Sequence, residues 1–248
     1  MSVSWTKGTL VGKTVWAPGL FTLHVQCPGV QPFEPGQFLH LALDVGGEQV
    51  HRPYSVASPH GDILDFFIVT VPEGQLSPRL EALQVGDQVE VSEKAAGGFI
   101  LDKAAPLDDL WLFATGTGLA PYIAMLRTEM PWQRFRKIVL IHGVRNASDL
   151  AYLEEIRKWK NDFGEQFQYL GCLSRDQAEG CLSGRTTDLL DDGCLEAAVG
   201  LTIAAQASVV MICGNPAMLE QLEAILIDRS LVKARHSKPG NLISERYW

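Results

Sequence analysis

The apolar pattern of the chain changes its period once, near Ala105 and Pro106, and this change limits the possible folds most. Before it, short runs rich in Val, Phe, Leu and Thr are separated by Gly and Pro turns, which predicts antiparallel strands. The six runs cover residues 9–15, 20–25, 37–43, 51–56, 64–71 and 88–92. We expect residues 1–104 to form a six-stranded antiparallel β-barrel, with a sandwich as the alternative, and one short helix capped by Ser77 and opened by Pro78.

After the change, apolar strands alternate with helical patterns. We expect strands at 110–114, 137–144, 167–173 and 209–213, and helices at 121–130, 149–163 and 217–229. Strands that alternate with helices predict a parallel sheet with helices on both faces. Residues 105–248 are therefore expected to form a second domain, of the α/β class.

Composition argues against several classes of function. The 248 residues include 21 Lys and Arg against 29 Asp and Glu, a poor balance for binding nucleic acid. No apolar run reaches the roughly 18–20 residues of a membrane span, and no signal peptide is visible. The five cysteines lack the spacing of a disulfide framework, a zinc ribbon or an iron–sulfur site. We expect a cytoplasmic protein without a bound metal.

The first motif with chemical content is Arg52-Pro53-Tyr54-Ser55, which lies in a predicted strand. Arg52 and Tyr54 are two residues apart, so both project to one face of the strand and Ser55 to the other. An Arg beside a Tyr can pair with a phosphate and stack on a flat ring at once. The alternative is a surface Arg next to a half-buried Tyr.

Two further motifs follow strands of the α/β half. The segment Gly116-Thr117-Gly118-Leu119-Ala120-Pro121 joins a strand to a helix, where backbone N–H groups favour an anion. Cys213-Gly214-Asn215-Pro216 follows another strand. Ligands lie beyond the carboxyl ends of parallel strands, so we expect Gly116 and Cys213 to meet at one edge of the sheet. Taken alone, a tight turn and a small buried cysteine are the alternatives.

The fourth motif is the C-terminus, Glu245-Arg246-Tyr247-Trp248. Chain ends usually fray into water, so two terminal aromatic rings need a flat surface to lie on. Packing against the core is the alternative.

In this order, the four motifs resemble those of the ferredoxin–NADP reductase family. The short chain with its terminal Trp resembles the bacterial ferredoxin/flavodoxin reductases of that family. The resemblance implies a non-covalent FAD in the barrel, with Arg52 on a phosphate, Tyr54 on the isoalloxazine and Ser55 near flavin N5. The other FAD contacts that it implies are Pro53, Phe67, Ile68, Val69, Thr70, Gln75, Leu76, Ser77, Thr117, Tyr247 and Trp248.

The resemblance also implies NADP(H) as the substrate of the α/β domain. Only a 2′-phosphate separates NADP from NAD, so an Arg that reads this phosphate is expected. The contacts that the resemblance implies are Gly116, Thr117, Gly118, Arg145, Ser174, Arg175, Arg185, Gly214, Asn215 and Pro216. Three solvated arginines are the alternative to a phosphate site. Ser55, Cys213 and Glu245 are the implied catalytic residues, with Cys213 beside nicotinamide C4.

The implied activity is hydride transfer from NADPH to FAD, followed by transfer of single electrons to ferredoxin or flavodoxin by a monomeric enzyme. Two alternatives stay open. One is an NAD(P)H–flavin reductase or the reductase component of an oxygenase. The other is a flavin-binding subunit without catalytic turnover.

Overall fold

The computed structural model describes residues 3–235 and 238–246 of the chain. It divides into two compact units by internal contacts. One comprises Met1–Ile100 with Ala120–Thr128, and the other Leu101–Leu119 with Glu129–Trp248. The domain boundary between residues 104 and 105 stays a prediction, because the chain passes between the units more than once.

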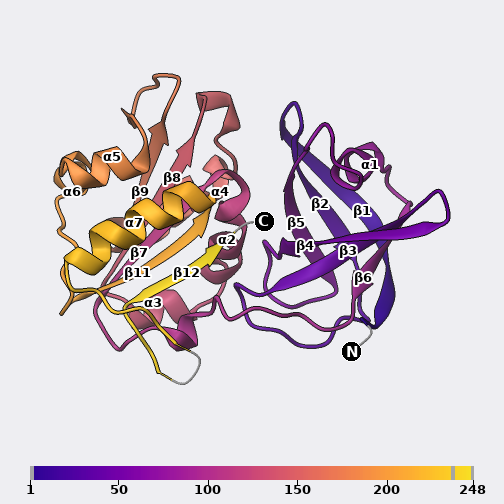
Figure 1. The fold of residues 1–248 in the computed structure, drawn as a ribbon, viewed down its shortest axis with the longest axis horizontal. Helices are drawn as coiled ribbons and strands as arrows, with labels where there is room; N and C mark the ends of the chain where they lie inside the picture. The colour runs from indigo at the N-terminus through magenta and orange to yellow at the C-terminus, as the bar shows by residue number, and fades with distance from the viewer. Residues whose placement is uncertain (1–2, 236–237, 247–248) are drawn as a thin grey trace. The chain divides into compact units, whose positions relative to one another are not determined.

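The first unit is built on a six-stranded antiparallel sheet in the order β4-β3-β6-β1-β2-β5 (Figure 1). Its elements are β1 (Trp5–Ala17), β2 (Leu20–Gln26), β3 (Phe38–Val45), β4 (Glu48–Ser55), β5 (Ile63–Val69), α1 (Ser77–Ala82) and β6 (Gln88–Ser92). The two outer strands meet where Val56 bridges Phe66 and the N–H of Ala57 donates to the carbonyl of Asp65 at 2.7 Å. This contact closes the sheet into the predicted barrel.

Apolar side chains that alternate with polar ones along the strands fill the interior of the barrel. Leu39 and Leu41 of β3 are fully buried in the core cluster, while His40 between them is only half-buried. Apolar residues two apart on a strand face the same side of a sheet, so each strand contributes one apolar face to the interior.

The second unit contains a six-stranded sheet in the order β10-β9-β8-β7-β11-β12, with every neighbouring pair parallel. Its strands are β7 (Asp109–Thr115), β8 (Lys137–Val144), β9 (Phe167–Leu173), β10 (Cys181–Ser183), β11 (Ser208–Gly214) and β12 (Leu242–Arg246). The helices of the α/β half are α2 (Ala120–Leu126), α3 (Met130–Arg134), α4 (Leu153–Phe163), α5 (Thr186–Asp191), α6 (Cys194–Val199) and α7 (Pro216–Asp228). Short 3-10 helices are η1 (Leu101–Lys103), η2 (Gly116–Leu119), η3 (Ala147–Asp149) and η4 (Gly164–Gln166).

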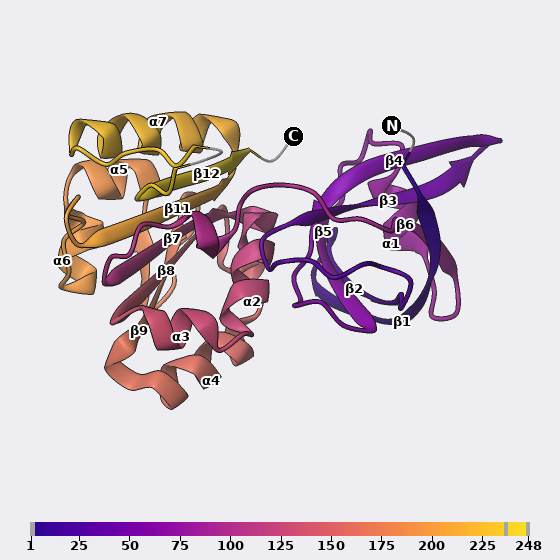
Figure 2. The same ribbon diagram turned by 90° about the horizontal axis from the view of Figure 1, so that it is seen from below.

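Helices cover both faces of this sheet, which confirms the predicted fold class. Buried residues of α5, α6 and α7 share one core cluster with Val139 and Ile141 of β8. On the opposite face, Trp132 of α3 and Trp159 of α4 contact the ring of Phe167 on β9. Figure 2 shows α5 and α7 on one side of the strands and α3 and α4 on the other.

Two local predictions were wrong. Ser77 is the first residue of α1 rather than its cap, and its hydroxyl accepts a hydrogen bond from the N–H of Val71 at 2.9 Å. The helix expected at 121–130 is divided into α2 and α3. The Thr128 hydroxyl donates to the carbonyl of Met125 at 2.7 Å, and Pro131 has no N–H to continue a helical ladder.

Candidate functional site

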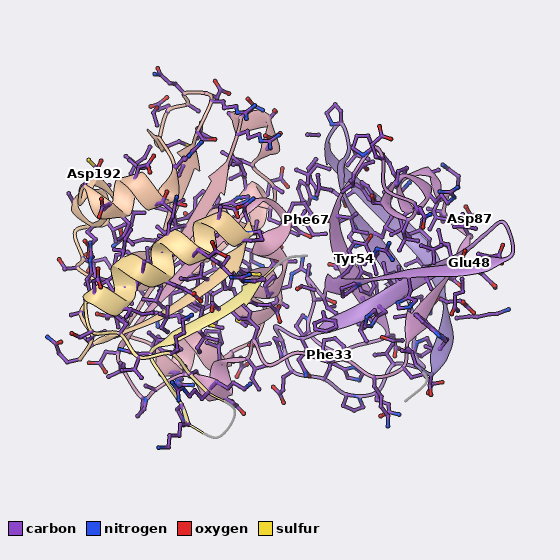
Figure 3. The ribbon with its side chains drawn as sticks, in the orientation of Figure 1. Phe33, Glu48, Tyr54, Phe67, Asp87 and Asp192 are labelled. Atoms are coloured by element: carbon purple, nitrogen blue, oxygen red, sulfur yellow. The ribbon has the colours of Figure 1, made fainter. Side chains whose placement is uncertain are left out.

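Strand β4 carries the Arg-Pro-Tyr-Ser motif at one edge of the barrel sheet. Arg52 and Tyr54 pair with the buried Leu41 and Leu39 of β3, so both lie on the core-side face of the strand. Arg52 is exposed, and the ring of Tyr54 is half-buried against the barrel core. Burial raises the pKa of Tyr54 to about 12, despite the opposing charge of Arg52, so the phenol stays neutral. Figure 3 shows Tyr54 on β4.

Pro53 and Ser55 complete the motif. Pro53 lacks a backbone N–H, and an outer strand is where a sheet tolerates that loss. Ser55 is only 4% exposed. The alternation predicted from the sequence holds, with Ser55 on the face opposite Tyr54.

Strand β5 offers an open edge beside this motif. Phe67 and Ile68 are buried and Val69 is exposed. In the described residues, β5 pairs with β2 along its length, and the chain after β4 contacts its other side at Asp65 and Phe66. The N–H of Asp65 donates to the Ser58 hydroxyl at 3.0 Å, on the side away from β2. Backbone groups alternate along a strand, so those of Val69 point to the same side. A planar ligand can therefore reach the backbone there.

The chain after β5 forms a turn that leads into α1. Thr70 donates its hydroxyl to Glu81 at 2.7 Å, which fixes the turn on the helix. Gln75 is exposed, while Leu76 and Ser77 are buried. Arg79 was not predicted, yet its guanidinium donates to the carbonyl of Gln75 and adds a cation to this end of the barrel unit.

In the α/β unit, the structure brings the two Gly-containing motifs together at the carboxyl end of the sheet. The N–H of Asn215 donates to the hydroxyl of Thr115 at 2.9 Å. A Cβ atom on Gly118 would lie 2.4 Å from the carbonyl oxygen of Cys213. Only a glycine permits this approach, because the two backbones touch. Thr115 was not among the residues predicted to form the site.

The side chain of Asn215 is the N-cap of helix α7. Its Oδ1 accepts from the N–H groups of Ala217 at 2.9 Å and Met218 at 3.4 Å, which caps α7. Pro216 opens the helix, as its fixed φ favours. The turn itself, with Gly214 at a φ of 139°, is therefore held from both sides.

Cys213 and Glu245 are register partners on the neighbouring parallel strands β11 and β12. Burial raises the pKa of the Cys213 thiol, and the charge of Glu245 adds to the shift, so Cys213 is an uncharged thiol. Burial also raises the pKa of Glu245 to about 7. The pair places a thiol beside a carboxyl group that can gain or lose a proton near neutral pH.

Three exposed arginines follow consecutive strands of the same sheet. Arg145 follows β8, Arg175 follows β9 and Arg185 follows β10. The N–H of Arg175 donates to the carbonyl of Arg145 at 2.9 Å, and that of Ser174 to the carbonyl of Val144 at 3.0 Å. These bonds hold two of the arginines at adjacent backbone positions. In the part of the chain that the structure describes, none of the three pairs with an acid.

Asp176, which was not predicted as a site residue, joins the loops that carry Arg145 and Arg175. Its Oδ2 accepts from the N–H of Ala147 at 3.0 Å, which ties the loop after β9 to the loop after β8. This bond and a second one from the N–H of Gln177 lower the pKa of Asp176. A phosphate placed between Arg145 and Arg175 would meet two loops that are already joined.

Thr117 is buried in η2. Tyr247 and Trp248, expected on the flavin and adenine, lie outside the described residues. Over the described ranges, no group of three or more His, Cys, Asp or Glu side chains could hold a metal ion. No described helix is long and apolar enough to cross a membrane.

Comparison with known proteins gives both units a family. Residues 9–96 match the oxidoreductase FAD-binding domain and residues 112–224 the oxidoreductase NAD-binding domain. The flavodoxin/ferredoxin–NADP reductase of Escherichia coli (strain K12) is 40% identical over 246 residues, 98% of this chain and 99% of that protein. The ferredoxin–NADP reductase of Pseudomonas aeruginosa is 36% identical, with 93% of each chain covered.

A solved structure is similar over the whole chain. It is a ferredoxin NADP+ reductase from Neisseria gonorrhoeae with bound FAD and NADP, which superposes with a TM-score of 0.93 at 26% identity. The match covers 100% of both chains. The order of the two units along the chain is therefore the same in both proteins.

Proposed function

Because this chain belongs to the flavodoxin/ferredoxin–NADP reductase family, we propose that it carries electrons from NADPH through one bound FAD to ferredoxin or flavodoxin. One observation carries the proposal. A chain that matches a relative of this name at 40% identity over 98% of its length also brings the Gly118 turn against the carbonyl of Cys213 and places Cys213 beside Glu245. The FAD-binding match lies within the barrel unit, and the NAD-binding match covers most of the α/β unit together with α2.

The barrel unit is proposed to hold FAD. The exposed guanidinium of Arg52 would pair with a phosphate, and the neutral ring of Tyr54 would pack against the isoalloxazine. Phe67, Ile68, Val69 and Thr70 would border the flavin, with the backbone groups of Val69 directed toward it. Gln75, Leu76 and Ser77 would border the pyrophosphate, and Pro53 and Ser55 would complete the cradle.

The α/β unit is proposed to hold NADP(H). The segment Gly116-Thr117-Gly118 would face the pyrophosphate with N–H groups, and Gly214-Asn215-Pro216 would border the nicotinamide ribose side. Arg145, Ser174, Arg175 and Arg185 would hold the 2′-phosphate. Thr117 is proposed to lie between the two cofactors, and Tyr247 and Trp248 to cover the FAD.

Bound FAD would supply the chemistry that side chains lack, because it accepts a hydride from NADPH and releases electrons one at a time. The side chains of the protein would position the reacting groups and hold a proton. Cys213 would contact the nicotinamide at C4, Ser55 would donate a hydrogen bond near N5, and Glu245 would hold a proton near neutral pH.

The proposal includes a monomer that acts in the cytoplasm. The five cysteines are unpaired and three of them are buried, which suits a reducing compartment. Light scattering on the purified protein measures the first part directly; a mass well above 27.2 kDa would contradict it.

Electron-acceptor assays test the function. We expect reduction of ferredoxin, flavodoxin or cytochrome c with NADPH, and much slower reduction with NADH at equal concentration. An enzyme that reduces free flavins but none of these protein acceptors would instead be a flavin reductase. A protein that binds FAD without turnover would be a flavin-binding subunit.

A further inference from the structure

His142 is a buried titratable residue that the proposed chemistry does not use. It lies on β8 and is fully buried. Val139 and Ile141 face the cluster under α5, α6 and α7, so alternation turns His142 to the opposite face of the sheet. There its Nε2 lies 3.1 Å from the carbonyl oxygen of Gly116, the first residue of η2.

The partner fixes the proton on the imidazole ring. A carbonyl oxygen only accepts hydrogen bonds, so Nε2 must carry the hydrogen and Nδ1 the lone pair. Burial lowers the pKa of His142 to about 4, and the bond to Gly116 only partly opposes this shift. The ring is therefore a neutral donor at physiological pH, with one defined tautomer.

The second nitrogen indicates that His142 is not there to stabilise the core. Nδ1 is buried without a hydrogen-bond partner among the described residues. An apolar side chain of similar size would fill the same place without an unsatisfied acceptor. The bond from Nε2 to Gly116 is thus the contribution that distinguishes histidine from an apolar residue here.

This bond sets the direction of a neighbouring donor. The peptide after Gly116 is trans, since the described chain contains no cis bond. In a planar trans peptide, the carbonyl and the following N–H point in opposite directions. When the Gly116 carbonyl points at His142, the N–H of Thr117 must point away from it. Gly116 itself has a φ of 52°, a conformation that other residues adopt at a cost.

Two other contacts hold the same turn on either side of this peptide. Gly118 touches the carbonyl of Cys213, and Thr115 accepts from the N–H of Asn215. Neither contact involves the peptide between Gly116 and Thr117, which the i→i+3 bonds of η2 orient along the turn. Among the described residues, His142 adds the side-chain hydrogen bond to that peptide.

We propose that His142 is a positioning residue that aims the Thr117 N–H at the nucleotide pyrophosphate. This inference rests on the proposed function, in which η2 receives that pyrophosphate. His142 touches no substrate and acts through the Gly116 peptide alone. It makes nucleotide affinity depend on a buried neutral donor one strand away.

The test compares two ligands on the FAD-loaded protein. NADP+ contains the pyrophosphate, whereas adenosine 2′-monophosphate contains the 2′-phosphate and no pyrophosphate. We expect His142→Leu to weaken NADP+ binding about 3- to 10-fold, as for the loss of one hydrogen bond. Binding of adenosine 2′-monophosphate should be unchanged, because the arginines that would hold it are not affected.

A pair of amides separates the hydrogen bond from packing. The amide nitrogen of Gln reaches the position of histidine Nε2, and that of Asn the position of Nδ1. His142→Gln should therefore restore NADP+ affinity to within about 2-fold of wild type, whereas His142→Asn should behave as His142→Leu. If His142→Leu does not fold, the Gln and Asn variants decide the question by themselves.

Val139→Ala is the matched control, since it removes buried volume from the same strand on the opposite face. It should lower the melting temperature without changing the ratio of the two affinities. The proposal is overturned by unchanged NADP+ affinity in His142→Leu and His142→Asn, or by an equal loss for both ligands. A wild-type protein that binds neither nucleotide would overturn the proposed function instead.

Discussion

Burial sets the protonation states of Glu245 and Cys213. It raises the pKa of Glu245, and it is the main cause of the raised pKa of Cys213. A buried carboxyl that is neutral at low pH and charged at high pH makes folding itself depend on pH. This dependence gives a test of the site that needs no substrate.

Replacement of the Glu245 carboxyl should change the free energy of unfolding at pH 8 but not at acidic pH. The pKa of Glu245 is about 7 in the folded chain and 4.5 ordinarily. Its contribution to the free energy of unfolding is therefore fully present below pH 4.5 and is lost as the pH rises from 4.5 through 7. Glu245→Gln escapes this loss and should be more stable than wild type by up to about 3 kcal/mol at pH 8. Below pH 4.5 the two should unfold alike. Urea unfolding of both proteins at pH 8 and below pH 4.5 checks this prediction. Glu48→Gln, which removes an exposed charge, is the control. An equal difference in the free energy of unfolding at the two pH values would contradict the prediction.

Arg175 offers a test of nucleotide choice at the same scale. A phosphate–Arg contact is worth about 1.5–3 kcal/mol, or roughly 10- to 150-fold in affinity. Arg175→Ala should raise the KM for NADPH by such a factor and leave the KM for NADH nearly unchanged. Arg157→Ala, on the exposed surface of α4, controls for the loss of one positive charge. Equal losses with both nucleotides would refute the role of Arg175.

Among the elements, those with a clear period were predicted well from the sequence. The strands expected at 88–92, 137–144 and 167–173 are β6, β8 and β9 with the same bounds. Strand β12 was not predicted, because Leu242 and Ile243 are followed by Ser, Glu and Arg, and such a polar sequence is not typical of a strand. α5 and α6 have six residues each, too few for a helical period to show.

The Gly-containing turns were found as motifs and were expected to meet at one edge of the sheet, but the individual hydrogen bonds around them were not predicted. No spacing in the sequence indicates that Thr115 accepts from Asn215, or that His142 bonds to Gly116. Such contacts join residues far apart along the chain, and they depend on strand order, which a single sequence leaves open. His142 also lies inside an apolar run, where nothing marks it as a polar anchor.

The close approach of η2 to β11 makes Gly118 sensitive to the smallest side chain. A Cβ atom there would lie 2.4 Å from the oxygen and 2.7 Å from the carbon of the Cys213 carbonyl. Gly118→Ala should therefore destabilise the protein by about 1–3 kcal/mol and weaken NADP+ binding. Gly61→Ala has open space around it and should change neither quantity. Denaturation and nucleotide titration on both variants decide this; an unchanged Gly118→Ala protein would contradict the geometry.

At the scale of the whole molecule, α2 belongs by its contacts to the barrel unit, although it continues directly from η2. Arg127, just beyond α2, donates to Asp65 of β5 at 2.7 Å and to the carbonyl of Ala57 at 2.9 Å. His24 of β2 contacts the other oxygen of Asp65 at 2.6 Å. One carboxylate therefore joins two strands of the barrel to the end of the helix that follows η2.

This carboxylate should stabilise the chain in a pH-dependent way. Burial would raise the pKa of Asp65, but the bonds from His24 and Arg127 outweigh it and lower the pKa. The stabilisation is thus present above the ordinary Asp pKa of about 3.9 and is lost as the pH falls through the lower folded value. Asp65→Asn should cost about 2–3 kcal/mol at pH 7 and much less below pH 3. Asp62→Asn, an exposed neighbour, serves as the control in acid denaturation; a pH-independent cost would contradict this assignment.

Anaerobic mixing of the purified protein with one equivalent of NADPH tests the central claim most directly, with the flavin absorbance followed in time. The account predicts a yellow protein with one FAD per chain, whose absorbance bleaches rapidly with NADPH, slowly with NADH, and returns when oxidised flavodoxin or ferredoxin is added. A chain that takes up no FAD, or whose bound FAD stays oxidised in the presence of NADPH, would contradict it.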